Sequence, residues 1–292
     1  MKKSNRKLYA FILIIASFFT PHLQSANILF DLGGVLLKTS QFEAIKQLGI
    51  KRLLSSLING NNPFKAKIRL FKLLKNLQAD YPNTFGAQDG KGREIPSIMC
   101  DWLANTKTND EIKAQINQYV QENPDNISNS DKKFLKETTD ILFSPQFVAN
   151  IQTVIPDGLK FVEECSDSDA EHNLFILSNW EKDSFDLTKD RFPELFNHFE
   201  KENMIISGEI QLIKPDPKIY HYALDELGLD KKTCIFFDDQ QVNVDAAKAC
   251  GIHAVLCKKA SYTDMKAALD AFIAGEHEQE NNTKEIQCPA TP

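Results

Sequence analysis

Five polar residues in this chain are of the types that handle phosphoryl groups. Asp31, Ser178 and the pair Asp238-Asp239 each come directly after a short apolar run, and Lys214 comes just before a helix signal. A carboxylate can attack phosphorus and form an acyl phosphate, which divides one difficult reaction into two easier steps. A hydroxyl and an ammonium group can hold the oxygens on which negative charge develops. These residue types therefore suit nucleophilic phosphoryl transfer, provided that the fold brings them together.

The same residues could also hold a divalent cation. Two carboxylates and a backbone carbonyl are oxygen ligands, which Mg²⁺ prefers. Such an ion would shield an attacking carboxylate from the phosphate charge and polarise a phosphoryl oxygen. We therefore expect Mg²⁺ as the cofactor.

Each stretch also has an ordinary interpretation when it stands alone. Asp31 is followed by Gly33 and Gly34, which fits a plain turn after a core strand, and Ser178-Asn179 fits a strand-end cap. Lys214-Pro-Asp-Pro fits a turn into a helix, with Asp216 as the N-cap. The Asp238-Asp239 pair is less ordinary, because acids after a buried strand are costly unless they are paired or bind a metal.

Alternating strand and helix patterns explain how these side chains could meet. From residue 151 onward, apolar runs predict strands over 174–177, 204–206, 234–237 and 253–256, and helical patterns lie between them. Such alternation predicts an α/β fold, with a Rossmann-like parallel sheet and helices on both faces. The carboxyl ends of parallel strands share one edge, where open α/β sheets bind ligands.

Residues 39–150 differ from this pattern and predict an all-helical module inserted after the first strand. Apolar residues recur at helical spacing, for example Ile45, Ile68, Trp102 and Phe134, and Gly-, Asn- and Pro-rich breakers separate the segments. Eight Lys and Arg residues occur over 41–75 against one acid. This basic segment is interpreted as a solvated helix face, with a basic lid for an anionic substrate as the alternative.

The two ends of the chain are interpreted separately from the fold. Residues 1–26 combine a basic start, an apolar stretch and a short polar end, which predicts a secretory signal peptide or, if uncleaved, an N-terminal anchor. The protein is therefore expected to be exported, to the periplasm or beyond, with membrane contact only if that segment stays. Residues 274–292 are charged and amide-rich and predict a disordered tail. The core then comprises residues 27–38 and 151–273.

Composition limits the partners that the protein could bind. The 292 residues carry a formal net charge of −6, so no global basic field suggests nucleic acid. The expected partner is a small phosphorylated molecule. An oxidising compartment would permit disulfides among six cysteines, with Cys250 and Cys257 as the nearest pair, whereas Cys234 is expected to be a buried thiol.

Taken together, the four stretches resemble the motifs of haloacid dehalogenase-like (HAD) hydrolases. The stretches Asp-Leu-Gly-Gly-Val-Leu, Leu-Ser-Asn, Lys-Pro-Asp-Pro and Phe-Phe-Asp-Asp occur in the family's order, and Asn243 follows the last of them. A helical cap after the first motif is typical of the phosphatase-like branch. Asn243 itself is interpreted as a helix cap.

The resemblance implies a role for each motif residue. Asp31 would be the nucleophile, and Lys214 would take part in catalysis while it binds the phosphoryl group together with Ser178 and Asn179. Mg²⁺ would be held by Asp31, the backbone carbonyl of Gly33 and Asp239, with Asp238 as a neighbouring or alternate ligand. Gly33 would also contact the substrate.

One departure from the family pattern bears on turnover. Most phosphatases of this family carry a second aspartate, as acid and base, two residues after the nucleophile, where this chain has Gly33. General acid–base catalysis typically contributes about 10²–10⁴-fold. The cap could supply a substitute acid, the substrate could have a good leaving group such as an aryl or acyl phosphate, or turnover could be slow.

These observations favour a Mg²⁺-dependent hydrolase of a small phosphate monoester that acts through an aspartyl-phosphate. One alternative is a 2-haloacid dehalogenase, although that branch lacks the acidic pair and has a bulky aromatic residue at the position of Gly33. Another is a non-catalytic exported module that keeps the fold and binds a partner.

Overall fold

The core of the protein is a five-stranded sheet in which every pairing is parallel. The computed structural model describes residues 25–48 and 66–275, and the strand order is β5-β4-β1-β6-β7. The strands are β1 (Asn27–Phe30), β4 (Asn173–Ser178), β5 (Met204–Ile206), β6 (Cys234–Asp238) and β7 (His253–Leu256). The predicted parallel sheet is therefore confirmed.

The strands are apolar along their length because both faces of the sheet are covered. In β1, Ile28 and Phe30 pack into one core cluster, whereas Leu29 packs into the cluster on the opposite face. This alternation is the two-residue period of a strand. The residues therefore read as one continuous hydrophobic run, as expected for a strand buried on both sides.

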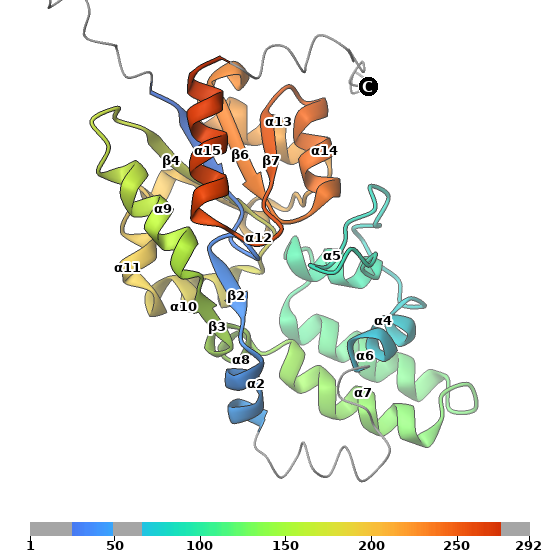
Figure 1. Cartoon of the computed structure of the whole chain (residues 1–292). Helices are drawn as coiled ribbons and strands as arrows, with labels where there is room; N and C mark the ends of the chain where they lie inside the picture. Colours follow the sequence, from blue (N-terminus) through green and yellow to red (C-terminus); the bar gives the residue numbers. More distant parts are fainter. Residues whose placement is uncertain (1–24, 49–65, 276–292) are drawn as a thin grey trace, which may run out of the picture.

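Helices cover both faces of this sheet (Figure 1). Helices α9 and α15 pack on one face with α10 and α11, whereas α13 and α14 pack on the other. The core helices are α9 (Pro156–Ser166), α10 (Lys182–Arg191), α11 (Pro193–Phe196), α12 (Ser207–Ile210), α13 (Pro217–Glu226), α14 (Gln241–Ala249) and α15 (Tyr262–Ile273), with 3-10 turns η2 (Lys201–Asn203) and η3 (Lys231–Thr233). The predicted Rossmann-like fold class is thereby confirmed.

The inserted segment is helical, as predicted, and has a hydrophobic core of its own. Its described helices are α2 (Gln41–Leu48), α4 (Ala66–Leu74), α5 (Ser97–Leu103), α6 (Asn109–Glu122), α7 (Asn129–Leu142) and α8 (Pro145–Asn150). Helices α4 to α7 group together beside the sheet in Figure 1, and Trp102 packs edge-on against Phe143 at their centre. Two residues expected on apolar faces, Ile45 and Ile68, are instead exposed.

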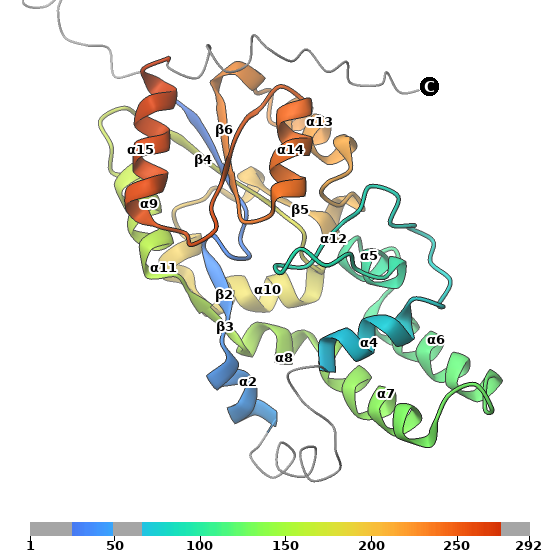
Figure 2. The same cartoon turned by 45° about the vertical axis from the view of Figure 1, so that its right-hand side comes forward.

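A short two-stranded ladder joins the helical insert to the sheet domain. Strands β2 (Leu37–Thr39) and β3 (Gln152–Val154) pair antiparallel, with Leu37 opposite Val154. In Figure 2 this ladder lies between the sheet and helices α2 and α8. We call it the neck. The sequence did not predict it, because three residues are too few to show a two-residue period.

Ser25 and Ala26, the residues just before the first strand, are already packed or hydrogen-bonded within the fold. Ala26 is buried in the main core cluster, its N–H donates to His172 Nδ1 (3.1 Å), and its carbonyl accepts from the Asn173 N–H (3.1 Å). Ser25 Oγ donates to the Glu171 carbonyl (2.8 Å). Most of the predicted signal peptide (1–26) and of the predicted tail (274–292), namely residues 1–24 and 276–292, lies outside the described residues.

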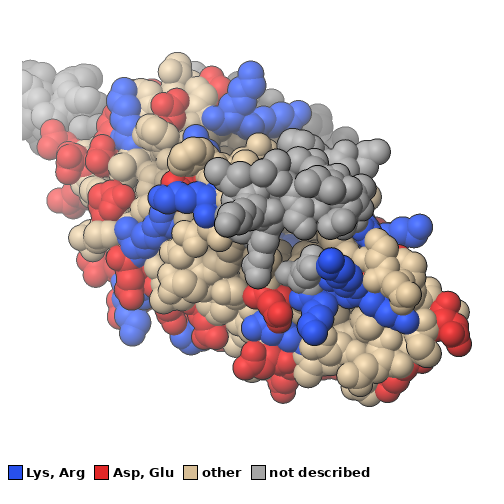
Figure 3. Space-filling model, turned by 90° about the horizontal axis from the view of Figure 1, so that it is seen from below, with Lys and Arg blue, Asp and Glu red and all other residues tan. Residues whose placement is uncertain are grey.

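Two further sequence interpretations can be compared with the described residues. Searched over those residues, the structure has no helix with the length and hydropathy that a membrane crossing requires. The described part of the basic segment lines no part of the pocket discussed below, and Arg69 pairs with Asp131 and Lys46 with Glu43. On the face seen from below, basic side chains lie among acidic ones (Figure 3). These observations favour the solvated helix face.

Candidate active site

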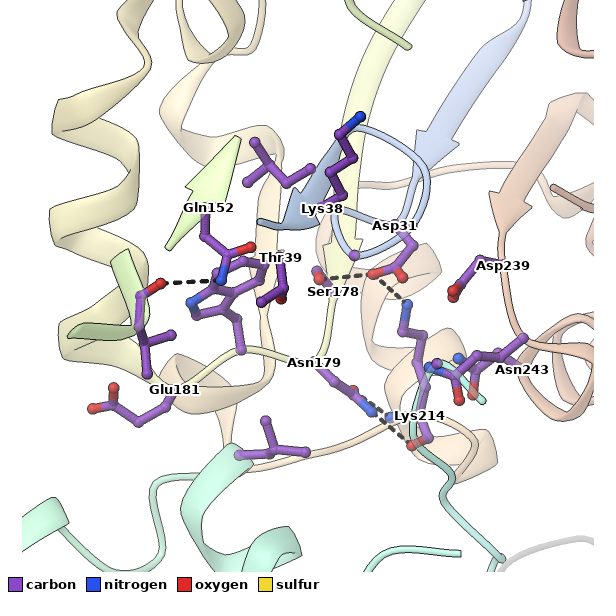
Figure 4. A pocket seen from close by; sticks show the side chains of 18 of the residues that line it. Asp31, Lys38, Thr39, Gln152, Ser178, Asn179, Glu181, Lys214, Asp239 and Asn243 are labelled. Carbon is purple, nitrogen blue, oxygen red and sulfur yellow. Dashed lines mark hydrogen bonds and ion pairs between the residues drawn. The ribbon is translucent and has the colours of Figure 1, made fainter. Parts of the chain in front are cut away.

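Asp31, Ser178 and Lys214 meet at the carboxyl edge of the sheet (Figure 4). Asp31 follows β1 and Ser178 ends β4, so the parallel register of these neighbouring strands brings the two residues together. Ser178 Oγ donates to Asp31 Oδ1 (2.7 Å), and Lys214 Nζ lies 2.9 Å from the same oxygen. All three side chains are buried. One oxygen of Asp31 is thus held by two donors.

The Lys214 ammonium uses all three of its protons within the site. Besides Asp31, it donates to Asp238 Oδ2 (2.7 Å) and to the Leu177 carbonyl (2.9 Å). Burial alone would lower the Lys214 pKa, but the carboxylates of Asp238 and Asp31 outweigh it and raise that pKa. Burial raises the pKa of Asp31, and the Lys214 charge opposes this shift. A charged lysine between two carboxylates therefore fits this site.

Asp238 is enclosed by donors. Its Oδ1 accepts from the Gln240 N–H (2.8 Å), and Asn243 Nδ2 lies 3.1 Å from both carboxylate oxygens. The expectation that Asn243 caps a helix is wrong: it lies within α14, whose N-cap is Gln240, and its side chain binds Asp238. With Lys214 on Oδ2, this carboxylate is already saturated, which suits a residue that positions Lys214.

Asp239 is the acid of this cluster that is short of partners. Its Oδ1 is buried without a hydrogen bond in the structure. Burial, followed by the charges of Asp31 and Asp238, raises its pKa to about 7. Ligand atoms of Asp31, Asp238 and Asp239 all lie within 4.8 Å of one another. An orphaned buried carboxylate beside a second one fits a hard divalent cation, which would neutralise both.

Two glycines leave room for the Asp239 carboxylate. Gly34 has a φ of +80°, and a Cβ at this position would overlap the Asp239 side chain. Gly90, in the loop between α4 and α5, would place a Cβ 3.5 Å from Asp239 Oδ2. The Gly90 loop is fixed by Asp89, which is buried and pairs with Arg93. The insert therefore reaches the candidate metal site.

Asn179 acts on the backbone of Lys214. Its Oδ1 accepts from the Lys214 N–H (2.7 Å) and its Nδ2 donates to the Lys214 carbonyl (2.8 Å). Asp216 caps α13 as predicted, and its other oxygen accepts from the Tyr81 hydroxyl of the insert (3.0 Å). Asn179 lies in the pocket wall, but its polar atoms are used to fix the loop that carries Lys214.

The rest of the pocket is built from residues that the sequence analysis did not assign to it. The cavity measures about 360 Å³ and extends from the cluster around Asp31 to the neck and to α5. Its additional lining comes from Thr39, Trp102, Leu103, Val148, Gln152 and Trp180. Among these residues, only Trp180 could be placed near the site from the sequence, because it directly follows Ser178-Asn179. The others come from the insert and the neck, whose placement depends on tertiary packing.

Hydrogen bonds tie the insert to the core around this cavity. Asn109 Nδ2 of α6 donates to Glu181 Oε1 (3.0 Å), and Trp102 Nε1 donates to Asn109 Oδ1 (2.9 Å). Ser207 Oγ donates to the Leu103 carbonyl (2.7 Å). Glu181 also accepts from two N–H groups at the start of α10 and serves as its N-cap. The cap side of the pocket is thus anchored by side chains far apart in sequence.

The described cysteines do not form the disulfide considered above. Cys250, Cys257 and the other three are buried and form no disulfide with one another, and Cys288 lies outside the described residues. Cys234 is a buried thiol, as predicted. Burial raises the pKa of Cys257 to about 12.

With the fold and the site described, similarity to known proteins defines the class. A sequence model of the family "haloacid dehalogenase-like hydrolase" matches residues 26–251, which is more than half of the chain. The protein therefore belongs to the haloacid dehalogenase-like hydrolases, as its motifs indicated.

Curated relatives match over shorter stretches. The chain is 31% identical to rat bifunctional epoxide hydrolase 2 over 85 residues, which are 28% of this chain and 15% of the relative. It is 34% identical to a phosphorylated carbohydrates phosphatase of Thermotoga maritima over 68 residues, 23% of this chain and 32% of the relative. The matches thus span less than two thirds of the length of these relatives.

Solved structures resemble most of the chain at low sequence identity. A HAD family enzyme of Bacteroides thetaiotaomicron, in complex with magnesium and inorganic phosphate, is 17% identical, with a TM-score of 0.46 over 80% of this chain and 93% of that one. The L-2-haloacid dehalogenase of Xanthobacter autotrophicus, with chloropropionic acid covalently bound, is 15% identical, with a TM-score of 0.46 over 80% and 77%.

Proposed function

We propose that this hydrolase cleaves a small phosphate monoester with the help of Mg²⁺, by transferring the phosphoryl group to Asp31. The observation that carries the proposal is the pairing of a held carboxylate with an unsatisfied one. Asp31 is fixed by Ser178 and Lys214, and Asp239 lies beside it with a buried oxygen that lacks a partner. This arrangement offers one oxygen for attack and a cation site next to it.

The residues of the chain divide the work between them. Asp31 attacks phosphorus, while Ser178 and Lys214 hold charge that develops on the phosphoryl oxygens. Asp31, Asp239 and the Gly33 carbonyl would hold Mg²⁺, which neutralises the phosphate charge during attack. Asp238 and Asn243 keep Lys214 charged and in place. Water then cleaves the aspartyl-phosphate and restores Asp31.

The decisive experiment measures hydrolysis of 4-nitrophenyl phosphate by the purified chain with and without a chelator. We expect activity that requires Mg²⁺, and a loss of roughly 10⁴-fold or more in Asp31→Asn, as is common when a nucleophile is removed. Asp110→Asn, on an exposed position of α6, is the matched control. Mass spectrometry after acid quenching would locate the phosphoryl group on Asp31.

Two results would overturn this proposal in favour of the alternatives. Halide release from a 2-haloacid without added metal would indicate a dehalogenase. Binding of Mg²⁺ and a phosphate analogue without turnover of any phosphate ester would indicate a non-catalytic module. Activity that survives both chelation and Asp31→Asn would exclude the mechanism itself.

We also propose that the reaction takes place outside the cytoplasm. The basis is the leader-like pattern of residues 1–26. Fractionation of cells that express the full chain would test this, and recovery with a cytoplasmic marker would reject it.

A further inference from the structure

The pocket has two ends of different chemistry. The acids and Lys214 line one end, and the rest of the lining includes Trp102, Leu103, Val148 and Trp180 together with Asn179 and Glu181. Thr39 and Gln152 add two polar groups on the neck side (Figure 4). If Asp31 receives the phosphoryl group, the remainder of the ester must occupy the second end. Two indoles and two aliphatic side chains suit a compact group with an apolar, flat face.

A phosphate ester also needs a way to stabilise the oxygen that leaves. Five titratable side chains line the pocket: Asp31, Lys38, Glu181, Lys214 and Asp239. Among the described residues, no histidine, cysteine or tyrosine lines it. The undescribed stretch 49–65 of the insert contains no acid, histidine, cysteine or tyrosine. Within the described part of the chain, a proton donor for the leaving oxygen must therefore be sought among these five.

None of the five is placed to give a proton to the leaving group. Asp31 is the nucleophile and Asp239 the candidate metal ligand, while Lys214 already donates to three acceptors. Glu181 accepts three hydrogen bonds, so both of its oxygens already have donors, and it points away from Asp31 in Figure 4. Lys38 is exposed and extends away from the Asp31–Ser178 pair.

The backbone next to the nucleophile does not supply an acid either. Gly33 has no side chain, although a Cβ there would lie 3.8 Å from Asp31 Oδ2, an ordinary contact. The position thus has room for a side chain that the sequence does not provide. The residue two positions after the nucleophile therefore supplies no proton to the leaving oxygen.

We infer that the substrate is an aryl phosphate, whose leaving group is stable as an anion and whose ring fits the apolar end of the pocket. The inference rests on the proposed function. Asp31 forms a bond to phosphorus as the bond from phosphorus to the aryl oxygen breaks. The electron pair departs with that oxygen as a phenolate, which takes a proton from water after release. Water then attacks phosphorus, returning Asp31 as a carboxylate and releasing inorganic phosphate.

The magnitudes favour this class over simple alkyl esters. A phenolic hydroxyl has a pKa of about 10, whereas water, which an aliphatic alcohol resembles, has one of about 15.7. An enzyme without a general acid loses about 10²–10⁴-fold in rate when the leaving group needs a proton. The loss is small for a leaving group that is stable as an anion.

The test compares phenyl phosphate with cyclohexyl phosphate, which have rings of similar size. We expect kcat/KM to be at least about 100-fold higher for phenyl phosphate. Acetyl phosphate shares the acidic leaving group without the ring, and its KM should be at least tenfold higher than that of phenyl phosphate. Equal KM values for these two would overturn the assignment of an aryl group.

A gain-of-function pair sharpens the test. In Gly33→Asp, a new acid should lower the phenyl-to-cyclohexyl ratio of kcat/KM at least tenfold. Gly33→Asn has nearly the same shape but no proton to give, so its ratio should stay at the wild-type value. Equal shifts in both variants would contradict the inference. If neither variant folds, the ratio in the unaltered protein decides.

The outcomes separate this inference from the proposed function. Hydrolysis of phenyl and cyclohexyl phosphate with kcat/KM within tenfold would overturn the inference while the protein remains a phosphatase. Failure to hydrolyse any of the three compounds, with Mg²⁺ present, would overturn the proposed function and the inference with it.

Discussion

The two ends of the pocket differ in how their polar groups are used. At the sheet edge, Asp31, Ser178, Lys214 and Asp238 form a buried network in which nearly every donor and acceptor has a partner inside the site. At the cap and neck end, apolar side chains such as Trp102 and Val148 line the pocket beside polar ones, and polar groups such as Asn109 serve to attach the insert. Under the proposed function, the first end carries out the reaction and the second selects the substrate. Mutations at the two ends should therefore differ in kind.

The largest effect on stability is expected when Lys214, the cation that balances the buried carboxylates, is removed. Lys214→Met leaves Asp31 and Asp238 as buried carboxylates without their shared cation, so we expect a loss of about 3–5 kcal/mol in unfolding free energy. Urea denaturation measures it. Lys38→Met removes an exposed lysine instead and should change stability by about 0.5 kcal/mol or less. Equal stability of the two variants would show that the network is not a stabilising charge balance.

The second prediction distinguishes an effect of backbone strain on stability from an effect on Mg²⁺ binding. Gly34→Ala forces a side chain onto a φ of +80° and into the Asp239 carboxylate, so Mg²⁺ affinity should fall at least about 100-fold. Gly228→Ala meets a similar backbone, with a φ of +60° and no atom within 4 Å. Both should lose about 1–2 kcal/mol of stability from strain. Calorimetric Mg²⁺ titration should distinguish them, and unchanged binding in Gly34→Ala would place the ion elsewhere.

At the other end, Asn109→Ala tests the attachment of the insert. The change leaves Trp102 Nε1 without its buried partner and removes one of the two donors to Glu181 Oε1, which typically costs about 1–3 kcal/mol. We expect KM to rise with a smaller change in kcat, because the catalytic network is untouched. Asn76→Ala, which removes an exposed hydrogen bond to Tyr119, is the control. A fall in kcat alone would contradict the division between the two ends.

The smallest effect is a pH dependence of Mg²⁺ binding. With a pKa of about 7, Asp239 is mostly protonated at pH 6, so the apparent affinity should be about tenfold weaker than at pH 8, or about 1.4 kcal/mol. Without Mg²⁺, the free energy of unfolding should depend on pH in the opposite direction. The folded state holds this proton more tightly than the unfolded one, so its contribution to stability is present at low pH and is lost as the pH rises through 7.

Thermal unfolding at pH 6 and pH 8, with Mg²⁺ and with a chelator, measures both trends. A Mg²⁺-induced shift of the same size at the two pH values would show that Asp239 does not take part in binding.

The sequence predicted the sheet end of the site well, for a physical reason. Asp31, Ser178 and Asp238-Asp239 stand where apolar strands end, and parallel pairing forces such ends together. Lys214 was recognised through the turn and N-cap that follow it. Asn243 was assigned wrongly, because an asparagine early in a helix has the same local signal whether it caps the helix or binds a neighbouring carboxylate.

The cap end could not be predicted in the same way. Thr39 and Gln152 belong to strands of three residues, and Gly90 lies near Asp239 only because the insert folds back over the sheet edge. Such contacts depend on how two hydrophobic cores dock, and no local pattern of residues encodes that docking. Ile45 and Ile68 show the same limit, because helical spacing alone did not reveal which face the insert buries.

If residues 1–26 contain the proposed leader, the burial of Ala26 bears on where it can be cut. A peptidase that cuts after this alanine would take a methyl group out of the core and strip the Asn173 amide of its acceptor. A cut after Ser25 would keep both and leave a new α-amino group 3.1 Å from His172 Nδ1. The mature protein would then begin directly at the first strand, with no linker between the proposed leader and the sheet domain.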